Sequence, residues 1–268
     1  DLVKNPFFLK MLAQNFFEGK RLDLNRGKLF EIFLLNSFNL DQNHFKGTFS
    51  LREKKIEIYN LLQTVALGME IMSKNQIQEA DLLELLSSEQ FNTLKHCLVF
   101  KKKAGEDDVW QFEHNNIQEF LAAKALSNLR FDKVITLISF QPKHIKLIPS
   151  WVNTLAFLVS ILDNEQELFQ LTLKWLVEHE PALVVKFESD KVPINLRNKI
   201  FKNIFEHSKK QDIWLTSNKF NYDMLARFGD TKENVTYLIS ELKNERNTKV
   251  VISNAVKIVT NFRLHDSL

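Results

Sequence analysis

The residue with the clearest chemical potential in this chain is a histidine, His114, which stands where a predicted short strand meets a predicted helix. Trp110, Phe112 and His114 alternate along the segment, so their side chains share one face of the strand. An imidazole at the start of a helix lies beside outward-pointing backbone N–H groups, which is a favourable environment for an anion. The spacing therefore predicts an anion-sensing histidine.

The residues that follow His114 predict the helix that positions it. Asn115 and Asn116 are both good N-cap residues, and Gln118 and Glu119 follow three positions after each, so two capping boxes overlap. An apolar stripe then continues the helix, and its members are Ile117, Phe120, Leu121 and Ala125. We expect the strand to run directly into this helix.

The same segment resembles the end of the winged-helix domain in NACHT-type signalling NTPases of the STAND class. In that family an aromatic-x-His-x-x-(aliphatic or aromatic)-Gln-Glu-aromatic-Leu-Ala-Ala pattern recurs. The match here is Phe112-Glu-His114-Asn-Asn-Ile117-Gln118-Glu119-Phe120-Leu121-Ala122-Ala123. The resemblance implies that His114 contacts the β-phosphate of bound ADP and helps to lock a resting state. The alternative is a helix-entry side chain that bonds to the backbone.

A second match lies near the start of the chain. The segment Lys4-Asn5-Pro6-Phe7-Phe8-Leu9 resembles the Asn-Pro-Leu-Leu-Leu segment that follows the NACHT nucleotide-binding core. In the family this proline lines the adenine pocket, so the resemblance implies that role for Pro6. The alternative is a proline in the first turn of an ordinary helix, where its missing N–H has no cost.

Hydrophobic periodicity predicts a mostly α fold in three parts. The first part, residues 1–45, is a small helical subdomain. The second, residues 46–130, is a winged-helix domain with one β-hairpin. The third, residues 131–268, is a HEAT-like α-solenoid of successive helices. The resemblance to NACHT proteins covers residues 1 to about 130.

Individual elements follow from the same patterns. In the first two parts we expect helices at about 6–17, 26–38, 51–73, 77–86 and 88–96, and hairpin strands at 98–100 and 109–112. In the third part we expect helices at about 131–139, 150–162, 165–179, 182–188, 194–208, 220–228, 231–243 and 247–262. Gly229 suits the residue after a helix, and Asp230 with Glu233 predicts a capping box for the next one.

The sequence lacks the motifs of a self-sufficient enzyme. It has no Gly-x-x-x-x-Gly-Lys-Ser/Thr phosphate loop, no acidic run for Mg²⁺, no zinc motif and no Gly-x-Ser-x-Gly nucleophile elbow. We therefore expect no catalytic residue, no metal site and no cofactor in this chain alone. The resemblance implies that ADP or ATP binds, with Mg²⁺, only together with an ATPase core upstream, and that the full-length protein is an ATPase.

The composition further limits the fold classes and the cellular environments that the chain fits. With only 6 Gly and 5 Pro in 268 residues, the chain has too few turn residues for a large β-sandwich or barrel. Its single cysteine, Cys97, excludes an internal disulfide, and its apolar neighbours indicate a buried thiol and a reducing cytoplasm. No run approaches the roughly 20 apolar residues of a membrane span.

Three functions are compatible with these observations. The first is the regulatory and sensor portion of a nucleotide-gated STAND NTPase, which would clamp ADP and couple ligand sensing to self-oligomerisation, in antiviral or stress defence. The second is an α-helical scaffold that binds a protein ligand. A basic face that could serve it consists of Lys199, Lys202, Lys209 and Lys210.

The third function is DNA binding by the winged helix. Its cations would be Lys101, Lys102 and Lys103 on the hairpin. The predicted helix at 88–96 carries only Lys95 as a cation, and the net charge of +3 is only mildly basic. Both observations argue against DNA as the partner.

Overall fold

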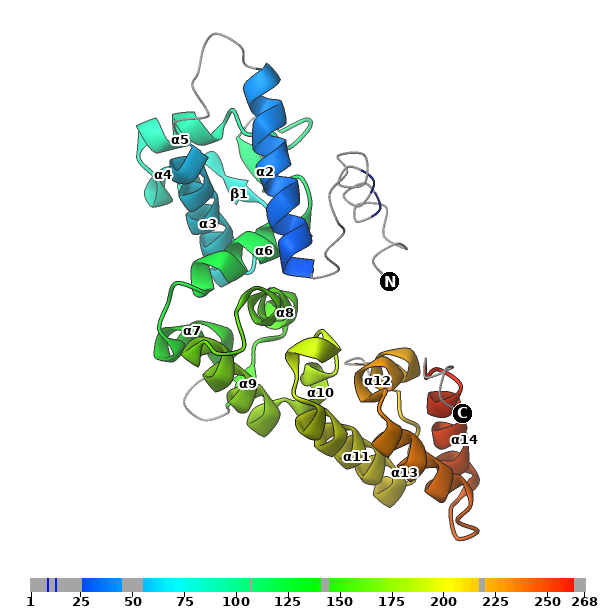
Figure 1. Cartoon of the computed structure of the whole chain (residues 1–268). Coiled ribbons are helices and arrows are strands. Elements are labelled where there is room, and N and C mark those ends of the chain that lie inside the picture. The colour runs from blue at the N-terminus through cyan, green and yellow to red at the C-terminus, as the bar shows by residue number, and fades with distance from the viewer. Residues whose placement is uncertain are drawn as a thin grey trace. The chain divides into compact units, whose positions relative to one another are not determined.

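The structure is a computed structural model of the chain, and it is mostly helical, which confirms the predicted fold class at that level (Figure 1). It describes residues 26–44, 55–106, 108–140, 145–216 and 220–262, together with Leu9 and Ala13. Pro6 and most of the predicted helix at 6–17 lie outside the described residues. Among the helices of these ranges, none combines the length and the apolar character that a membrane crossing requires.

The chain forms two compact units, residues 1–163 and residues 164–268. Each unit has its own apolar core. The division expected from the sequence, with boundaries near residues 45 and 130, stays a prediction.

The first unit combines helices with two small sheets. Its helices are α2 (Arg26–His44), α3 (Lys55–Ile71), α4 (Glu79–Leu85), α5 (Ser88–Leu94), α6 (Asn115–Leu126), α7 (Phe131–Ile138), the 3-10 helix η2 (Pro149–Trp151) and α8 (Val152–Ile161). Its strands are β1 (Ile77–Gln78), β2 (Phe100–Lys102), β3 (Val109–Phe112), β4 (Ser139–Phe140) and β5 (Lys146–Leu147).

Helix α6 lies at the centre of the first unit, where it packs against α3 and α8, and α2 contacts both α6 and α8 (Figure 1). Phe30 of α2, Phe120 of α6 and Phe157 of α8 meet with ring centroids 4.8 to 5.7 Å apart. All three rings are fully buried. Their one stacked and two edge-to-face contacts stabilise the core beyond simple burial. The predicted apolar stripe of α6 therefore faces this core.

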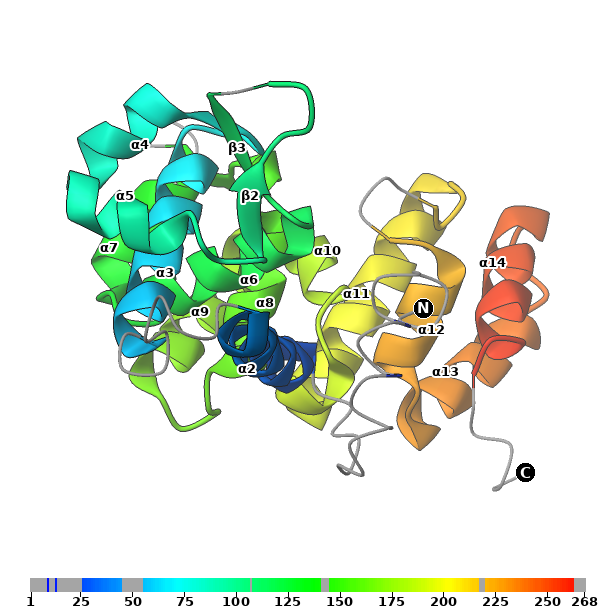
Figure 2. The same ribbon diagram turned by 90° about the horizontal axis from the view of Figure 1, so that it is seen from above.

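The larger sheet has the antiparallel order β1-β3-β2, and Figure 2 shows β2 and β3 side by side. The predicted hairpin is confirmed, although β2 begins at Phe100 rather than Leu98 because the Phe100 N–H donates to the Cys97 carbonyl in a turn at 3.3 Å. The predicted single helix at 77–86 is wrong at its start, because Ile77 pairs with Trp110 of β3. The pair β4–β5 forms a second small sheet that the sequence did not predict.

The second unit consists of helices along its described residues. They are α9 (Glu167–His179), α10 (Pro181–Val184), the 3-10 helix η3 (Ser189–Lys191), α11 (Ile194–Gln211), α12 (Tyr222–Gly229), α13 (Lys232–Leu242) and α14 (Lys249–Val259). Helix α11 contacts α10, α12 and α13, and α14 packs on α12 and α13 (Figure 1). Most of these elements agree with the predicted helices of this region, apart from small shifts at their ends. The predicted helix at 182–188 is wrong in its second half, because α10 ends at Val184, and η3 was not predicted.

The start of α13 differs from the prediction. Thr231, not Asp230, is the N-cap, and its Oγ1 accepts a hydrogen bond from the Asn234 N–H at 3.2 Å. Glu233 closes no capping box; it accepts a hydrogen bond from Asn198 Nδ2 of α11 at 2.6 Å. Because α11 lies alongside, a partner on the neighbouring helix replaces the local one.

Gly229 has a different role from the one its sequence position suggested. It is the last residue of α12, and a Cβ atom there would overlap the ring of Phe201, which is fully buried on α11. The missing side chain therefore permits the close approach of two helices rather than a special backbone angle.

Candidate functional site

His114 lies between β3 and α6, as predicted, and it is itself the N-cap of the helix. Its backbone is extended (φ −150°, ψ 141°), and its Nδ1 accepts a hydrogen bond from the Asn116 N–H at 3.1 Å. The prediction that Asn115 or Asn116 caps the helix is wrong, because Asn115 is already the first helical residue. The bond between the Glu113 N–H and the Val99 carbonyl, 2.9 Å long, extends the strand pairing to the residue before the cap.

The cap determines which nitrogen of His114 carries the proton. A nitrogen that accepts a hydrogen bond must be unprotonated, so the neutral ring carries its hydrogen on Nε2. Burial lowers the pKa of His114 from its ordinary value of 6.5, and the nearby Glu113 carboxylate opposes this only in part. Near neutral pH the side chain is therefore a neutral imidazole whose Nε2–H is a hydrogen-bond donor.

Gln118, one turn after the cap, belongs to a buried polar network that joins three helices. Its Nε2 donates to Glu70 Oε1 of α3 and to the Lys74 carbonyl, both at 2.9 Å. Thr154 Oγ1 of α8 donates to Glu70 Oε2 at 3.3 Å. One carboxyl group thus connects α3, α6 and α8, and the Lys74 carbonyl fixes the orientation of the amide.

Burial strongly affects the pKa of the Glu70 carboxyl group, because the residue is only 7% exposed. Desolvation raises the pKa of Glu70 from 4.5 to about 7, against the opposing hydrogen bonds from Gln118 and Thr154. The negative charge of Glu119 adds to the rise. At neutral pH this group is therefore close to half-protonated.

Glu119, the neighbour of Gln118 in the sequence motif, forms a second buried carboxyl group on α6. Desolvation raises the pKa of Glu119, although a hydrogen bond from Asn153 Nδ2 at 2.9 Å and the positive charge of Arg26 oppose the rise. Its Oε2 is buried without a hydrogen-bond partner among the described residues. The Gln-Glu pair of the motif thus directs both side chains to neighbouring elements of the first unit.

The sequence could not have located all of this network. His114, Gln118 and Glu119 stand out in the motif, whereas Glu70 and Thr154 match no pattern. The one available signal was Glu70 itself, an acidic residue between Met69 and Ile71 in an apolar stretch of the helix. Pro6, the other residue that the resemblance singles out, lies outside the described residues, and its predicted role stays a prediction.

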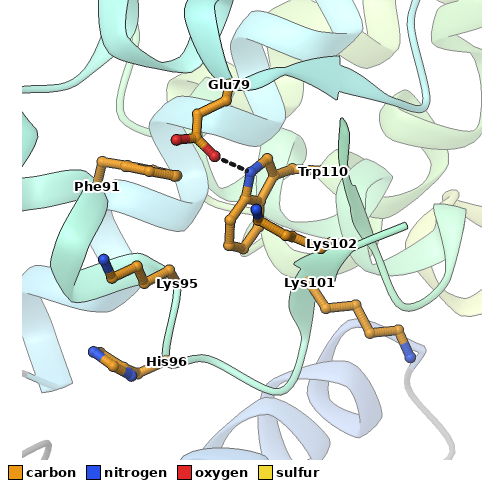
Figure 3. A pocket seen from close by; sticks show the side chains of 7 residues that line it. All are labelled: Glu79, Phe91, Lys95, His96, Lys101, Lys102 and Trp110. Atoms are coloured by element: carbon orange, nitrogen blue, oxygen red, sulfur yellow. Dashed lines mark hydrogen bonds between the residues drawn. The ribbon is translucent and has the colours of Figure 1, made fainter. Parts of the chain in front are cut away.

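A basic hollow of about 450 Å³ lies beside the larger sheet (Figure 3). Its lining consists of Glu79, Phe91, Lys95, His96, Lys101, Lys102 and Trp110. Trp110 Nε1 donates to Glu79 Oε2 at 3.0 Å, and Lys102 Nζ lies 5.8 Å from the centre of the Trp110 ring. Of the three predicted hairpin cations, Lys101 and Lys102 line the hollow, whereas Lys103 Nζ donates to Gln76 Oε1 at 3.3 Å and does not line it.

Other candidate chemistry is limited within the described ranges. Cys97 is buried, as its apolar neighbours predicted. The part of the chain that the structure describes contains no cluster of three or more His, Cys, Asp or Glu residues suited to a metal ion. Comparison of the chain with models of known protein families, with curated proteins and with solved structures found no match.

Proposed function

We propose that this chain is the regulatory and sensor portion of a nucleotide-gated STAND NTPase of the NACHT type. In this proposal residues 1–45 adjoin an upstream ATPase core, residues 46–130 are a winged-helix domain, and residues 131–268 are a HEAT-like repeat region. The chain order α3-β1-α4-α5-β2-β3, in which β3 pairs with both β1 and β2, supports the second assignment. The succession of neighbouring helices from α11 to α14 supports the third.

The neutral imidazole at the start of α6 carries the proposal. His114 uses Nδ1 to cap the helix, so its Nε2–H is the donor that a phosphate oxygen of ADP would accept. The N-terminal end of α6 adds a favourable field for an anion. No residue of this chain is proposed to take part in hydrolysis.

The buried network supports a switch rather than a passive clamp. A nucleotide can shift a conformational equilibrium only if it contacts two states differently. His114 and Gln118 lie on the same end of α6, and Gln118 is bonded to α3 through Glu70. A change in the phosphate at His114 would therefore act on a helix whose packing depends on that carboxyl group.

The test is the nucleotide content of the full-length protein, purified, denatured and analysed by chromatography. The wild type is compared with His114→Ala, which removes both cap and ring, and with His114→Ser, which keeps a good cap but removes the ring. We expect stoichiometric ADP in the wild type and its loss in both variants.

The two variants separate the phosphate contact from the cap. Retention of ADP by His114→Ser together with its loss from His114→Ala would mean that only the cap matters, and the phosphate role would be refuted. Absence of nucleotide from the wild type would refute nucleotide gating as a whole. The remaining functions would then be a helical scaffold for a protein ligand and a phosphate contact with nucleic acid.

A second candidate, phosphate contacts with nucleic acid, is favoured by the hollow in Figure 3. Lys95 and Lys102 line it together, although they come from α5's end and from β2. The Glu79 carboxylate in the same hollow opposes an anion. Binding of labelled duplex that weakens steeply between 50 and 200 mM salt, and is lost in Lys95→Glu, would support this candidate.

A further inference from the structure

The second unit contains a half-open cavity of about 590 Å³, which is lined by the end of α9, by α10 and α11, and by residues 213–216 and 220 after α11. Its apolar wall includes Val177, Pro181, Ile200, Ile204 and Trp214. The volume lies within the range of about 300 to 1,000 Å³ that is usual for small-molecule sites, which are mostly apolar with a few polar groups.

One edge of the cavity is polar and positively charged. Lys199, Asn203 and His207 recur every fourth residue on α11, so they form one row along the helix, beside the apolar row of Ile200 and Ile204. The three polar side chains are exposed, and within the described ranges they have no hydrogen bond or ion pair. The cavity is therefore apolar inside with a cationic rim.

Two of the other three lysines of α11 contrast with Lys199, and the third, Lys210, does not line the cavity. Lys202 forms an ion pair with Glu233, and Lys209 forms one with Glu241, each at 2.6 Å. Among the described residues that line the cavity, none is acidic. Charge complementarity thus favours an anionic group at the rim, near Lys199.

Residues 213–215 form the lip of the cavity, and hydrogen bonds hold this segment in place before any ligand binds. Asn254, fully buried on α14, donates from Nδ2 to the Ile213 carbonyl at 2.9 Å and accepts from the Leu215 N–H at 3.2 Å. Trp214 between them is 51% exposed, and Lys257 Nζ lies 4.7 Å from the centre of its ring. A lip fixed in this way lowers the entropic cost of ligand binding.

We propose that this cavity binds a monomeric amphipathic carboxylate, such as a free medium-chain fatty acid. The hydrocarbon chain lies against Ile200, Ile204 and Trp214, and the carboxylate accepts hydrogen bonds from Lys199 and the adjoining polar row. This inference stands on the second unit alone and is independent of the proposed nucleotide contact.

The test uses decanoate, below the concentration at which it forms micelles, with the full chain. Binding is followed by calorimetry and by the emission of Trp214, since Trp110, Trp151 and Trp175 are at most 8% exposed. We expect saturable one-to-one binding, a blue shift of the emission, and weaker binding of decanol. Added salt should weaken the binding of decanoate.

Variants locate the ligand. Ala182, which lines the cavity, is replaced by Phe to fill it, and Lys199 is replaced by Met to remove the charge. We expect Ala182→Phe to abolish binding and Lys199→Met to weaken it about threefold to tenfold, as for an exposed charge-assisted hydrogen bond. Lys174→Met is the matched control, because Lys174 is an exposed lysine of α9 outside the cavity. This variant should bind decanoate with the affinity of the wild type.

Three results would overturn the proposal. The first is no saturable binding of decanoate by the wild type. The second is equal affinity of decanoate and decanol together with no effect of Lys199→Met, which would exclude recognition of the carboxylate. The third is binding only to vesicles of phosphatidylcholine and phosphatidylglycerol, which would make the surface a membrane contact.

Discussion

Replacement of Glu70 by glutamine should stabilise the chain at alkaline pH and remove part of its pH dependence. The variant keeps the shape of the side chain and resembles its protonated form. Its amide oxygen can accept from Gln118 Nε2, and its amide nitrogen can donate to Thr154 Oγ1. The substitution therefore removes a charge without removing the network.

The magnitude follows from the two pKa values of Glu70. Because burial raises the pKa of Glu70 from 4.5 to about 7, the folded chain binds this proton more tightly than the unfolded chain. The resulting stabilisation is fully present below pH 4.5 and is lost as the pH rises through 7. Each pH unit between the two values changes the free energy of unfolding by about 1.4 kcal/mol, so the total loss is about 3 kcal/mol.

The assay is urea unfolding of the wild type and of Glu70→Gln at several pH values between 5 and 8. The difference in unfolding free energy between the two proteins reports Glu70 together with its coupling to Glu119, because the remaining groups titrate equally in both. We expect this difference to change by about 2 to 3 kcal/mol in favour of the variant from pH 5 to pH 8. A ¹³C titration of the Glu70 carboxyl group should have its midpoint near 7.

The matched control is Glu57→Gln, since Glu57 lies on the same helix but is exposed. The difference in unfolding free energy between Glu57→Gln and the wild type should vary little with pH. A difference for Glu70→Gln that is constant within about 0.5 kcal/mol from pH 5 to pH 8 would refute the reasoning, because it would mean that burial does not favour the neutral carboxyl group.

Three further changes test the packing and the caps. His114→Ala should lower the urea midpoint by the equivalent of about 1 kcal/mol, and His114→Ser should restore it. Because burial lowers the pKa of His114, the wild-type cap should weaken as the pH falls below 6.5, whereas the serine cap should not. Gly229→Ala should lower the melting temperature, with a net cost of about 1 to 3 kcal/mol from overlap with Phe201, and a smaller residue at position 201 should relieve it. Asn254→Ala should cost about 2 to 3 kcal/mol in thermal unfolding, because it leaves the buried Leu215 N–H and the part-buried Ile213 carbonyl without a partner. An unchanged melting temperature would contradict the bonding described for the lip.

Long periodic segments were predictable from the sequence, and short or long-range features were not. Helices such as α11 carry an apolar row over several turns, which marks them clearly. The two-residue strands β1, β4 and β5 carry no period that a sequence pattern could reveal. The pairing of β1 also depends on a partner far along the chain, because Ile77 pairs with Trp110.

The candidate site was predictable in position but not in its bonding. The alternation of Trp110, Phe112 and His114 located the junction, yet the choice of cap depended on the local backbone angles of His114. The link from Gln118 to Glu70 spans 48 residues, and the link from Glu70 to Thr154 spans 84. Contacts between such distant residues come from the packing of helices, which a single sequence does not specify.

The junction between β3 and α6 also has a mechanical consequence. Strand pairing continues through Glu113, and the next residue, His114, already caps the helix. Because these two residues are consecutive, no residue separates the strand pairing from the cap, and the connection contains no hinge. A force applied to the hairpin would therefore rotate α6 as part of the same rigid lever, and Gln118, one turn along, would transmit that rotation to α3.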